Sequence, residues 1–233
     1  MSANILVGGV ETFSVVDYPG QLAAVVFMQG CPWRCPFCYN AHIQKIGAQT
    51  NFLWPKFLAF LNERRGKLDA VVFSGGEPLV QDSLGEAISE VKALGYKIGL
   101  HTGGYRPSHL QKILPQLDWV GFDIKAPFET ERYQAVTQTN HLREVAESLD
   151  LLLASGIDFE CRTTCDPRLL TPHDIREMAR MLKDKGVKKY FLQKYRPVES
   201  DKETSEDQCE DFFADKGLLA ELKSWFVEFE VRK

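Results

Sequence analysis

The chain has 233 residues, 44% hydrophobic and 26% charged, which is typical of a folded protein, and we expect a single domain over residues 1–233. The formal net charge of −4 gives no overall attraction for phosphate backbones, so no nucleic-acid partner is expected. The N-terminus lacks a basic start before a long apolar run, and no stretch approaches the roughly 18 apolar residues of a spanning helix, so we expect a cytoplasmic protein without a membrane partner.

Apolar, β-branched runs alternate with segments of helical period, and such repeated β-α units predict a parallel sheet. Gly95, Gly156 and Gly186 each end a helix just before the next strand. The periodicity leaves open whether the sheet stays open or curls into a partial barrel. The expected strands cover residues 22–28, 69–74, 96–101, 119–124, 157–162 and 187–193, and the expected helices cover 54–65, 82–94, 107–114, 140–155, 171–183 and 215–229.

A strongly acidic segment precedes the last expected helix. Residues 198–211 contain seven acidic residues against one lysine and few apolar ones. We interpret this segment as an exposed connecting loop, with a partner-binding loop as the alternative.

Three of the six cysteines, Cys31, Cys35 and Cys38, follow the first expected strand in a C-x3-C-x2-C pattern. Without an export signal the thiols should stay reduced and free to bind metal. Thiolates suit both iron-sulfur clusters and zinc, and a four-iron cluster held by three thiolates keeps one iron open to another ligand. A zinc site completed by His42 is the alternative, which the ligand count does not separate.

The turn Gly75-Gly76-Glu77-Pro78 follows the second expected strand. Its glycines allow close approach of the backbone to a ligand, and its carbonyls and carboxylate can accept hydrogen bonds from an ammonium group. Taken alone, the same four residues also fit an ordinary turn.

Polar side chains follow the remaining strands, and the carboxyl ends of parallel strands meet on one face. Asp123 and Lys125 are two residues apart on a strand, so their side chains should point the same way. Lys125 and Arg162 could each bind the carboxylate of a ligand. Alternatively, Lys125 forms only an ion pair at the end of the strand, and Arg162 binds only an acidic neighbour. His101 is expected to be structural.

The cysteine spacing, with Phe37 before the third cysteine, resembles the signature of the radical S-adenosylmethionine (SAM) superfamily, and the glycine-glycine-glutamate-proline turn strengthens the resemblance. It implies a parallel β/α partial barrel of about six strands. It also implies one 4Fe-4S cluster on Cys31, Cys35 and Cys38. The SAM-binding residues that it implies are Gly75, Gly76, Glu77, Pro78, Thr102, Asp123, Lys125 and Arg162.

The segments 11–14 and 16–20, together with Asp123-Ile124-Lys125, resemble glycyl-radical-enzyme activating proteins. The similarity is nearest to those that activate anaerobic ribonucleoside-triphosphate reductases, with pyruvate formate-lyase activating enzymes more distant. It implies that one electron from an external donor such as flavodoxin or ferredoxin cleaves SAM, and that the resulting 5'-deoxyadenosyl radical abstracts hydrogen from a partner glycine. His101 stands where the lyase activases carry an aspartate, which puts a carboxylate-based cation site there in doubt.

Two other functions are compatible with these residues. One is a radical SAM enzyme acting on a small molecule, and the other is a zinc-stabilised binding module without catalysis. Cys161, Cys165 and Cys209 are spread too loosely to suggest a second cluster, and we interpret them as structural thiols.

Overall fold

The computed structural model describes residues 3–199 and 201–232. In this part of the chain, eight strands form a sheet in which each strand lies beside its neighbour in sequence. All neighbouring strands run parallel except the first pair, which is antiparallel. The strands are β1 (Val7–Ser14), β2 (Ala23–Met28), β3 (Ala70–Gly75), β4 (Lys97–Thr102), β5 (Trp119–Asp123), β6 (Phe159–Cys165), β7 (Lys189–Lys194) and β8 (Glu228–Arg232).

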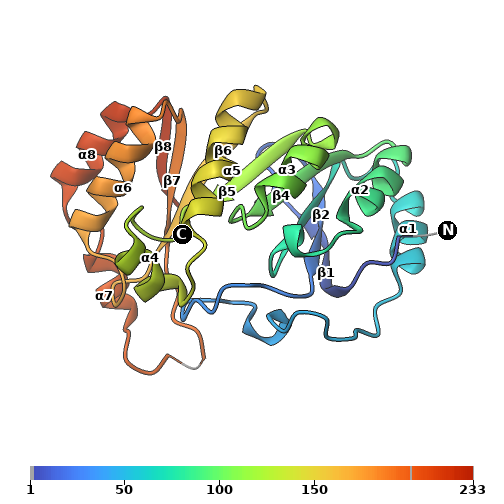
Figure 1. Ribbon diagram of the computed structural model, residues 1–233, viewed down its shortest axis with the longest axis horizontal. Helices are drawn as coiled ribbons and strands as arrows, with labels where there is room; N and C mark the ends of the chain where they lie inside the picture. Colours follow the sequence, from blue (N-terminus) through green and yellow to red (C-terminus); the bar gives the residue numbers. More distant parts are fainter. Residues whose placement is uncertain (1–2, 200, 233) are drawn as a thin grey trace.

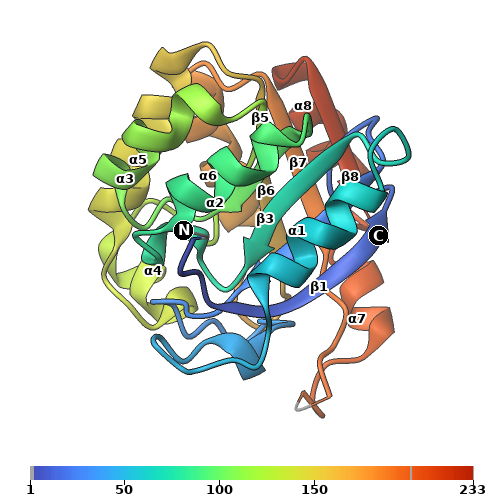
Figure 2. The same ribbon diagram turned by 90° about the vertical axis from the view of Figure 1, so that its right-hand side faces the viewer.

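The helices connect successive strands and cover one face of the sheet (Figure 1). The sheet curves around its other face, and β1 does not pair with β8 in the described chain, so the result is an open, partial barrel (Figure 2). The α/β fold with parallel strands is therefore confirmed. The helices are α1 (Trp54–Glu63), α2 (Leu84–Ala93), α3 (Pro107–Ile113), α4 (Thr130–Thr137), α5 (Leu142–Ser155), α6 (Pro172–Asp184), α7 (Glu206–Asp211) and α8 (Lys216–Trp225).

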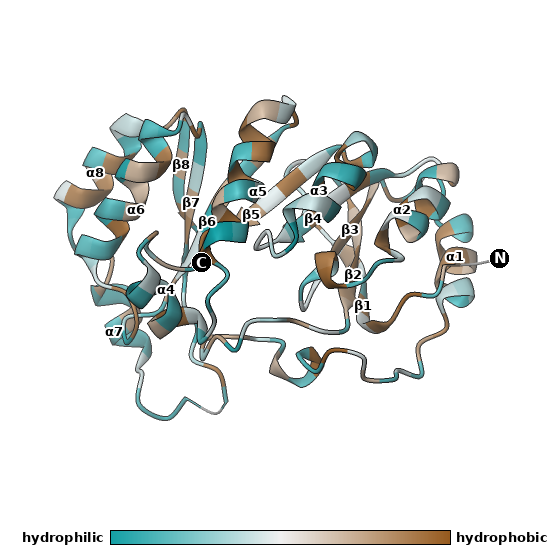
Figure 3. Cartoon of the chain, in the orientation of Figure 1, coloured by the Kyte–Doolittle hydropathy of each residue, from teal (hydrophilic) through white to brown (hydrophobic). Residues whose placement is uncertain are grey.

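The main hydrophobic core lies between the sheet and its helices, where strand interiors and the inward sides of the helices are apolar (Figure 3). A smaller cluster occupies the opposite face of the sheet. It forms because the chain after β1 folds back, so that the Tyr18 ring stacks on Trp119 with centroids 5.1 Å apart. This second cluster fills the concave face near the amino ends of the strands. The carboxyl ends of the strands are left free for a site.

The structure differs from the expected elements at four points. Strands β1 and β8 add to the expected set, and the last expected helix ends at Trp225 because the alternating residues of β8 pair with β7. Helix α4 was not expected, since few of its residues are apolar. The acidic segment is not all loop: α7 begins within it at a capping box formed by Ser205 and Gln208.

Cys161, Cys165 and Cys209 are fully buried in the main core. The described chain contains no helix that is both long and apolar enough to span a membrane. The described strands all belong to the same sheet, and a single domain over residues 1–233 stays a prediction.

Gly156 offers a test of whether a glycine at the end of a helix stabilises this fold. It ends α5 with φ of +74°, a conformation that costs a residue with a Cβ about 1–2 kcal/mol, and a Cβ there would meet no atom within 4 Å. Gly156→Ala should therefore lower the free energy of unfolding by about 1–2 kcal/mol in urea titrations under reducing conditions.

Gly85→Ala is the matched control, because Gly85 lies inside α2 and an added Cβ would make only an ordinary 3.4 Å contact with Ile113. We expect this variant to be as stable as the parent or up to about 1 kcal/mol more stable. Equal losses in both variants would contradict the argument from backbone conformation.

Candidate functional site

A pocket lies at the carboxyl ends of the strands, on the concave face above the Tyr18 cluster. It encloses about 870 Å³ of space, counted up to its open mouth. The expected site residues that line it are Cys31, Cys35, Cys38, Gly75, Gly76, Asp123, Lys125 and Arg162. The fold therefore brings together most of the residues that sequence analysis singled out, from four separate segments of the chain.

The loop that carries the cysteines is fixed at both ends by backbone hydrogen bonds. The Gly30 and Cys31 amides donate to the carbonyls of Ile43 and Gln44, so the loop closes on itself after the third cysteine. The buried Gln29 amide group donates to the carbonyls of Ile43 and Lys45. These bonds hold the three thiols on one side of the pocket.

Cys31 and Cys35 are buried, and Cys38 is partly exposed. Burial raises the pKa of Cys31 to about 12 and that of Cys35 to about 11, although the Lys125 ammonium nearby opposes both shifts. Deprotonation of these thiols therefore requires a cation to replace the proton, which iron supplies when it coordinates a thiolate.

The geometry fits a multi-atom cluster better than a zinc ion. Among residues 3–199 and 201–232, no group of three or more His, Cys, Asp or Glu side chains is close enough to hold a single metal ion. His42, the fourth ligand of the zinc alternative, is exposed and does not line the pocket. The three thiols line one pocket without meeting at a single point, which is compatible with ligands of a multi-atom cluster.

The turn after β3 depends on its glycines. A Cβ at Gly75, whose φ is +104°, would lie 2.3 Å from the Met28 nitrogen, and a Cβ at Gly76 would lie 2.2 Å from the Gly30 oxygen. The Gly76 and Glu77 amides donate to the carbonyls of Met28 and Gly30. The turn is therefore packed directly against the start of the cysteine loop.

The Glu77 carboxylate does not face the pocket. It is buried and accepts hydrogen bonds from the Thr102 hydroxyl (2.5 Å) and from the amides of Gly103 (2.9 Å) and Leu79 (3.1 Å). Burial raises its pKa to about 7, while these donors oppose the shift. An ammonium group in the pocket would therefore meet the carbonyls of this turn, and Glu77, Pro78 and Thr102 would shape the site without lining it.

Asp123 lies between two cations on the pocket wall. One of its oxygens accepts from Nη2 of Arg162 at 2.9 Å, and the other accepts from Nζ of Lys125 at 3.2 Å. Burial alone would raise the Asp123 pKa, but Lys125 and Arg162 lower it to about 2. The ion pairs expected as the alternative roles of Lys125 and Arg162 are therefore present. The three groups together still carry one net positive charge, so this wall of the pocket can attract a carboxylate.

His101 contacts this cationic wall through Arg162. Its Nδ1 lies 3.2 Å from the Ser74 hydroxyl, and its Nε2 lies 2.8 Å from the Asp17 carbonyl and 3.2 Å from Arg162. Burial and the Arg162 charge lower the His101 pKa to about 3, so the ring is neutral. A guanidinium therefore stands beside the imidazole, which agrees with the structural role expected for His101.

Sequence analysis missed Trp33, which lies between the first two cysteines. Its indole donates to the Tyr133 hydroxyl of α4 at 2.7 Å, and Nζ of Lys125 lies 5.3 Å from its ring centroid. A Cβ on Gly103 would lie 2.7 Å from the same ring. Its position inside the cysteine motif was a signal, but the contact with α4 depends on a helix that was not expected.

Comparison with known families places these residues in a wider group. The model of the radical SAM superfamily matches residues 25–182, which contain all three cysteines and the turn after β3. A protein of Methanocaldococcus jannaschii, provisionally named a glycyl-radical enzyme activating enzyme, is 27% identical over 84% of this chain and 82% of its own length. The pyruvate formate-lyase-activating enzyme of Clostridium pasteurianum is 28% identical over 80% of each chain.

Solved structures share the fold at low sequence identity. A radical SAM methyltransferase from Sphaerobacter thermophilus has a TM-score of 0.68 at 15% identity, over 92% of this chain and 67% of that one. Streptococcus suis SuiB bound to S-adenosylmethionine has a TM-score of 0.66 at 12% identity, over 88% of this chain and 48% of its own length. This chain thus spans about half of SuiB.

The position of Glu77 yields a prediction. In Glu77→Gln, the amide nitrogen must face one of the donors Thr102, Gly103 or Leu79, which leaves a buried donor without an acceptor at a cost of about 1–3 kcal/mol. We expect the free energy of unfolding of the cluster-free chain to fall by that amount and the KM for SAM to rise in the loaded enzyme.

Glu86→Gln on α2 is the matched control, since Glu86 lies outside these contacts. It should change neither quantity. A Glu77→Gln variant with parental stability would show that the carboxylate contacts contribute nothing to the site.

Proposed function

This chain belongs to the radical SAM superfamily, as an enzyme of the type that activates glycyl-radical enzymes, and we propose that its partner is an anaerobic ribonucleoside-triphosphate reductase. The observation that carries the chemistry is the pocket shared by the three cysteines, the glycine turn after β3 and the cationic wall of β5 and β6. The cofactors of the family, a 4Fe-4S cluster and SAM, are those of this chain.

Different residues of the pocket would bind the cluster and SAM. Cys31, Cys35 and Cys38 would hold the cluster, whose open iron, with bound SAM, supplies a one-electron cleavage that yields a carbon-centred radical. The carbonyls of Gly75 and Gly76 would accept from the SAM amino group.

Lys125 and Arg162 would attract the SAM carboxylate, with Asp123 holding both cations in place. Lys125 is suited to this task because it stays charged: burial alone would lower its pKa, but the Asp123 carboxylate raises it. The buried Trp33 and Phe37 rings would exclude water and stray hydrogen donors from the reacting atoms.

The reductase is favoured by the resemblance of segments 11–14 and 16–20 to the activators of that enzyme. The relatives named pyruvate formate-lyase-activating enzymes support a second candidate, pyruvate formate-lyase. A small-molecule substrate has weaker support: a relative from a Thermoplasmatales archaeon, named an S-adenosylmethionine-dependent nucleotide dehydratase, is 23% identical over 58% of this chain. The cytoplasmic location expected from the sequence stays a prediction.

The test is activation of a partner under anaerobic conditions. The chain carrying a reconstituted cluster is mixed with dithionite, SAM and either purified reductase or purified lyase, and the glycyl radical is measured by electron paramagnetic resonance. We expect a radical on the reductase, together with 5'-deoxyadenosine and methionine as products. Cys35→Ala should yield neither product nor radical.

Each other outcome has a defined meaning. A radical on the lyase alone would replace the first partner by the second. Cleavage of SAM without a radical on either protein would favour a small-molecule substrate, and a cluster that forms but never supports cleavage would contradict the proposed SAM site.

A further inference from the structure

Tyr39 lies at the mouth of the pocket, beside the most exposed of the three proposed cluster ligands. It directly follows Cys38 in the chain, and both residues line the pocket. Tyr39 is 47% exposed, and Cys38 is partly exposed, whereas Cys31 and Cys35 are buried. The edge of the site that solvent can reach is therefore the edge at which Tyr39 lies.

A distant part of the chain holds the Tyr39 ring in place. The ring stacks on Tyr195, which follows β7, with centroids 6.3 Å apart and an angle of 26° between the planes. The Tyr39 hydroxyl accepts from the Arg196 amide at 2.9 Å, and the Arg196 guanidinium lies 5.6 Å from the ring centroid. These contacts restrict a side chain that would otherwise rotate freely, so the ring keeps its position at the mouth.

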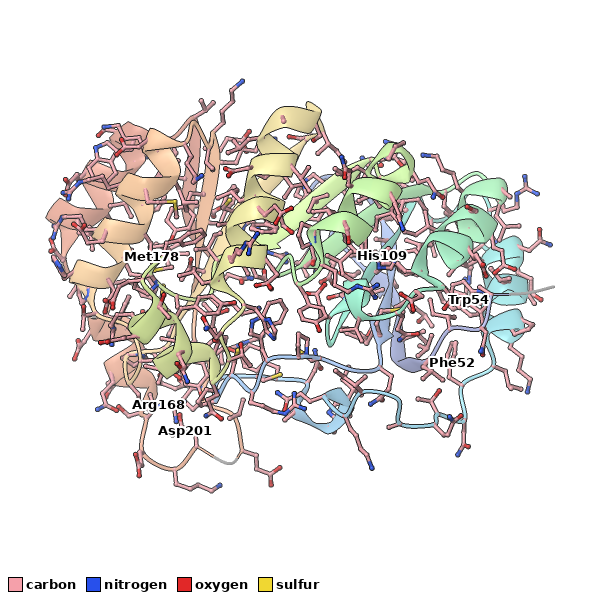
Figure 4. All side chains as sticks on the ribbon, in the orientation of Figure 1. Phe52, Trp54, His109, Arg168, Met178 and Asp201 are labelled. Atoms are coloured by element: carbon pink, nitrogen blue, oxygen red, sulfur yellow. The ribbon has the colours of Figure 1, made fainter. Side chains whose placement is uncertain are left out.

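Tyr195 is itself fixed by buried polar contacts. It is fully buried, and its hydroxyl donates to Asp201 at 2.9 Å and accepts from Arg168 at 3.1 Å. Arg168 also forms ion pairs with Asp201 (2.9 Å) and with the buried Asp166 (2.5 Å). Figure 4 shows Arg168 and Asp201 next to each other, at the end of the molecule that carries α4 and α7. The base of the acidic segment thus anchors the ring that supports Tyr39.

We propose that Tyr39 limits the access of water and dioxygen to the cluster, at the Cys38 side of the pocket. The shell of side chains around a metal site controls solvent access and polarity, and through them the reduction potential. Tyr39 acts here as a positioning residue that binds neither iron nor SAM. The proposal rests on the cluster assigned to the three cysteines, and it does not depend on which partner receives the radical.

Solvent access changes two measurable properties of an iron-sulfur cluster. Dioxygen and water reach an exposed cluster sooner, which shortens its lifetime in air. Reduction adds one negative charge to the cluster, and water stabilises the more highly charged state, so exposure also raises the midpoint potential. A tyrosine that only packs the acidic segment against the rest of the protein would change neither property when it is replaced.

The test compares matched variants that are loaded with cluster under anaerobic conditions. Tyr39→Ala removes the ring, and Tyr39→Phe keeps the ring without its hydroxyl. Phe13→Ala removes an aromatic ring of similar exposure (55%) that does not line the pocket. Iron and sulfide contents are determined first, and circular dichroism checks folding. The loss of visible cluster absorbance is then followed in air-saturated buffer, and midpoint potentials are measured by redox titration.

We expect the cluster of Tyr39→Ala to decay roughly tenfold faster than that of the parent, with a higher midpoint potential and an unchanged KM for SAM. Tyr39→Phe should stay close to the parent because the stacked ring remains, and Phe13→Ala should match the parent. A folded Tyr39→Ala chain that loses its cluster already during loading, beside a fully loaded Tyr39→Phe chain, would also support the proposal.

A parental cluster lifetime and midpoint potential in Tyr39→Ala would overturn the proposal, as would an equal loss in Phe13→Ala. A raised KM for SAM with a parental cluster lifetime would assign Tyr39 to SAM binding instead. If the iron and sulfide contents show that the parent chain holds no 4Fe-4S cluster, the proposed cofactor site itself fails. That failure is seen in the parent, before any variant is compared.

Discussion

The buried carboxylate of Glu77 is the interaction on which the site most depends. Moving an ionised carboxylate out of water costs several kcal/mol unless hydrogen-bond donors replace the solvent. Here the donors come from the turn of Glu77 itself and from the loop after β4, so the carboxylate fixes two loops that are separated by a helix. One of these bonds holds Gly103. Because Gly103 has no Cβ, the Trp33 ring of the cysteine loop can pack against it.

The electrostatics of the pocket also depend on a single carboxylate that is shared by several partners. Asp123 is shared by Lys125 and Arg162, which keeps both cations charged and close to the thiols while their mutual repulsion is reduced. The neutral His101 adds no charge and fixes the chain after β1 through the Asp17 carbonyl. A positive wall beside ligands that must be thiolates suits both an anionic cluster and a carboxylate-bearing cofactor.

The acidic segment before α8 begins beside the cysteine loop, since the Tyr39 ring stacks on Tyr195 with centroids 6.3 Å apart and the Tyr195 hydroxyl donates to Asp201. The acidic segment is itself anchored, because Asp201 accepts from the Tyr195 hydroxyl and pairs with Arg168. Its exposed carboxylates therefore project from a fixed base.

The sequence by itself pointed to Cys31, Cys35 and Cys38 as one set of ligands, which stays a prediction, and determined the order of the six central strands. Both are local properties: the cysteine spacing lies within eight residues, and Gly95, Gly156 and Gly186 take the positive φ that ends a helix. Tertiary structure alone decided that Glu77 turns away from the pocket, that His42 faces solvent and that β1 and β8 join the sheet. These outcomes depend on contacts between residues far apart in the chain, such as Glu77 with Gly103 or Glu160 with Arg232, for which short-range periodicity carries no signal.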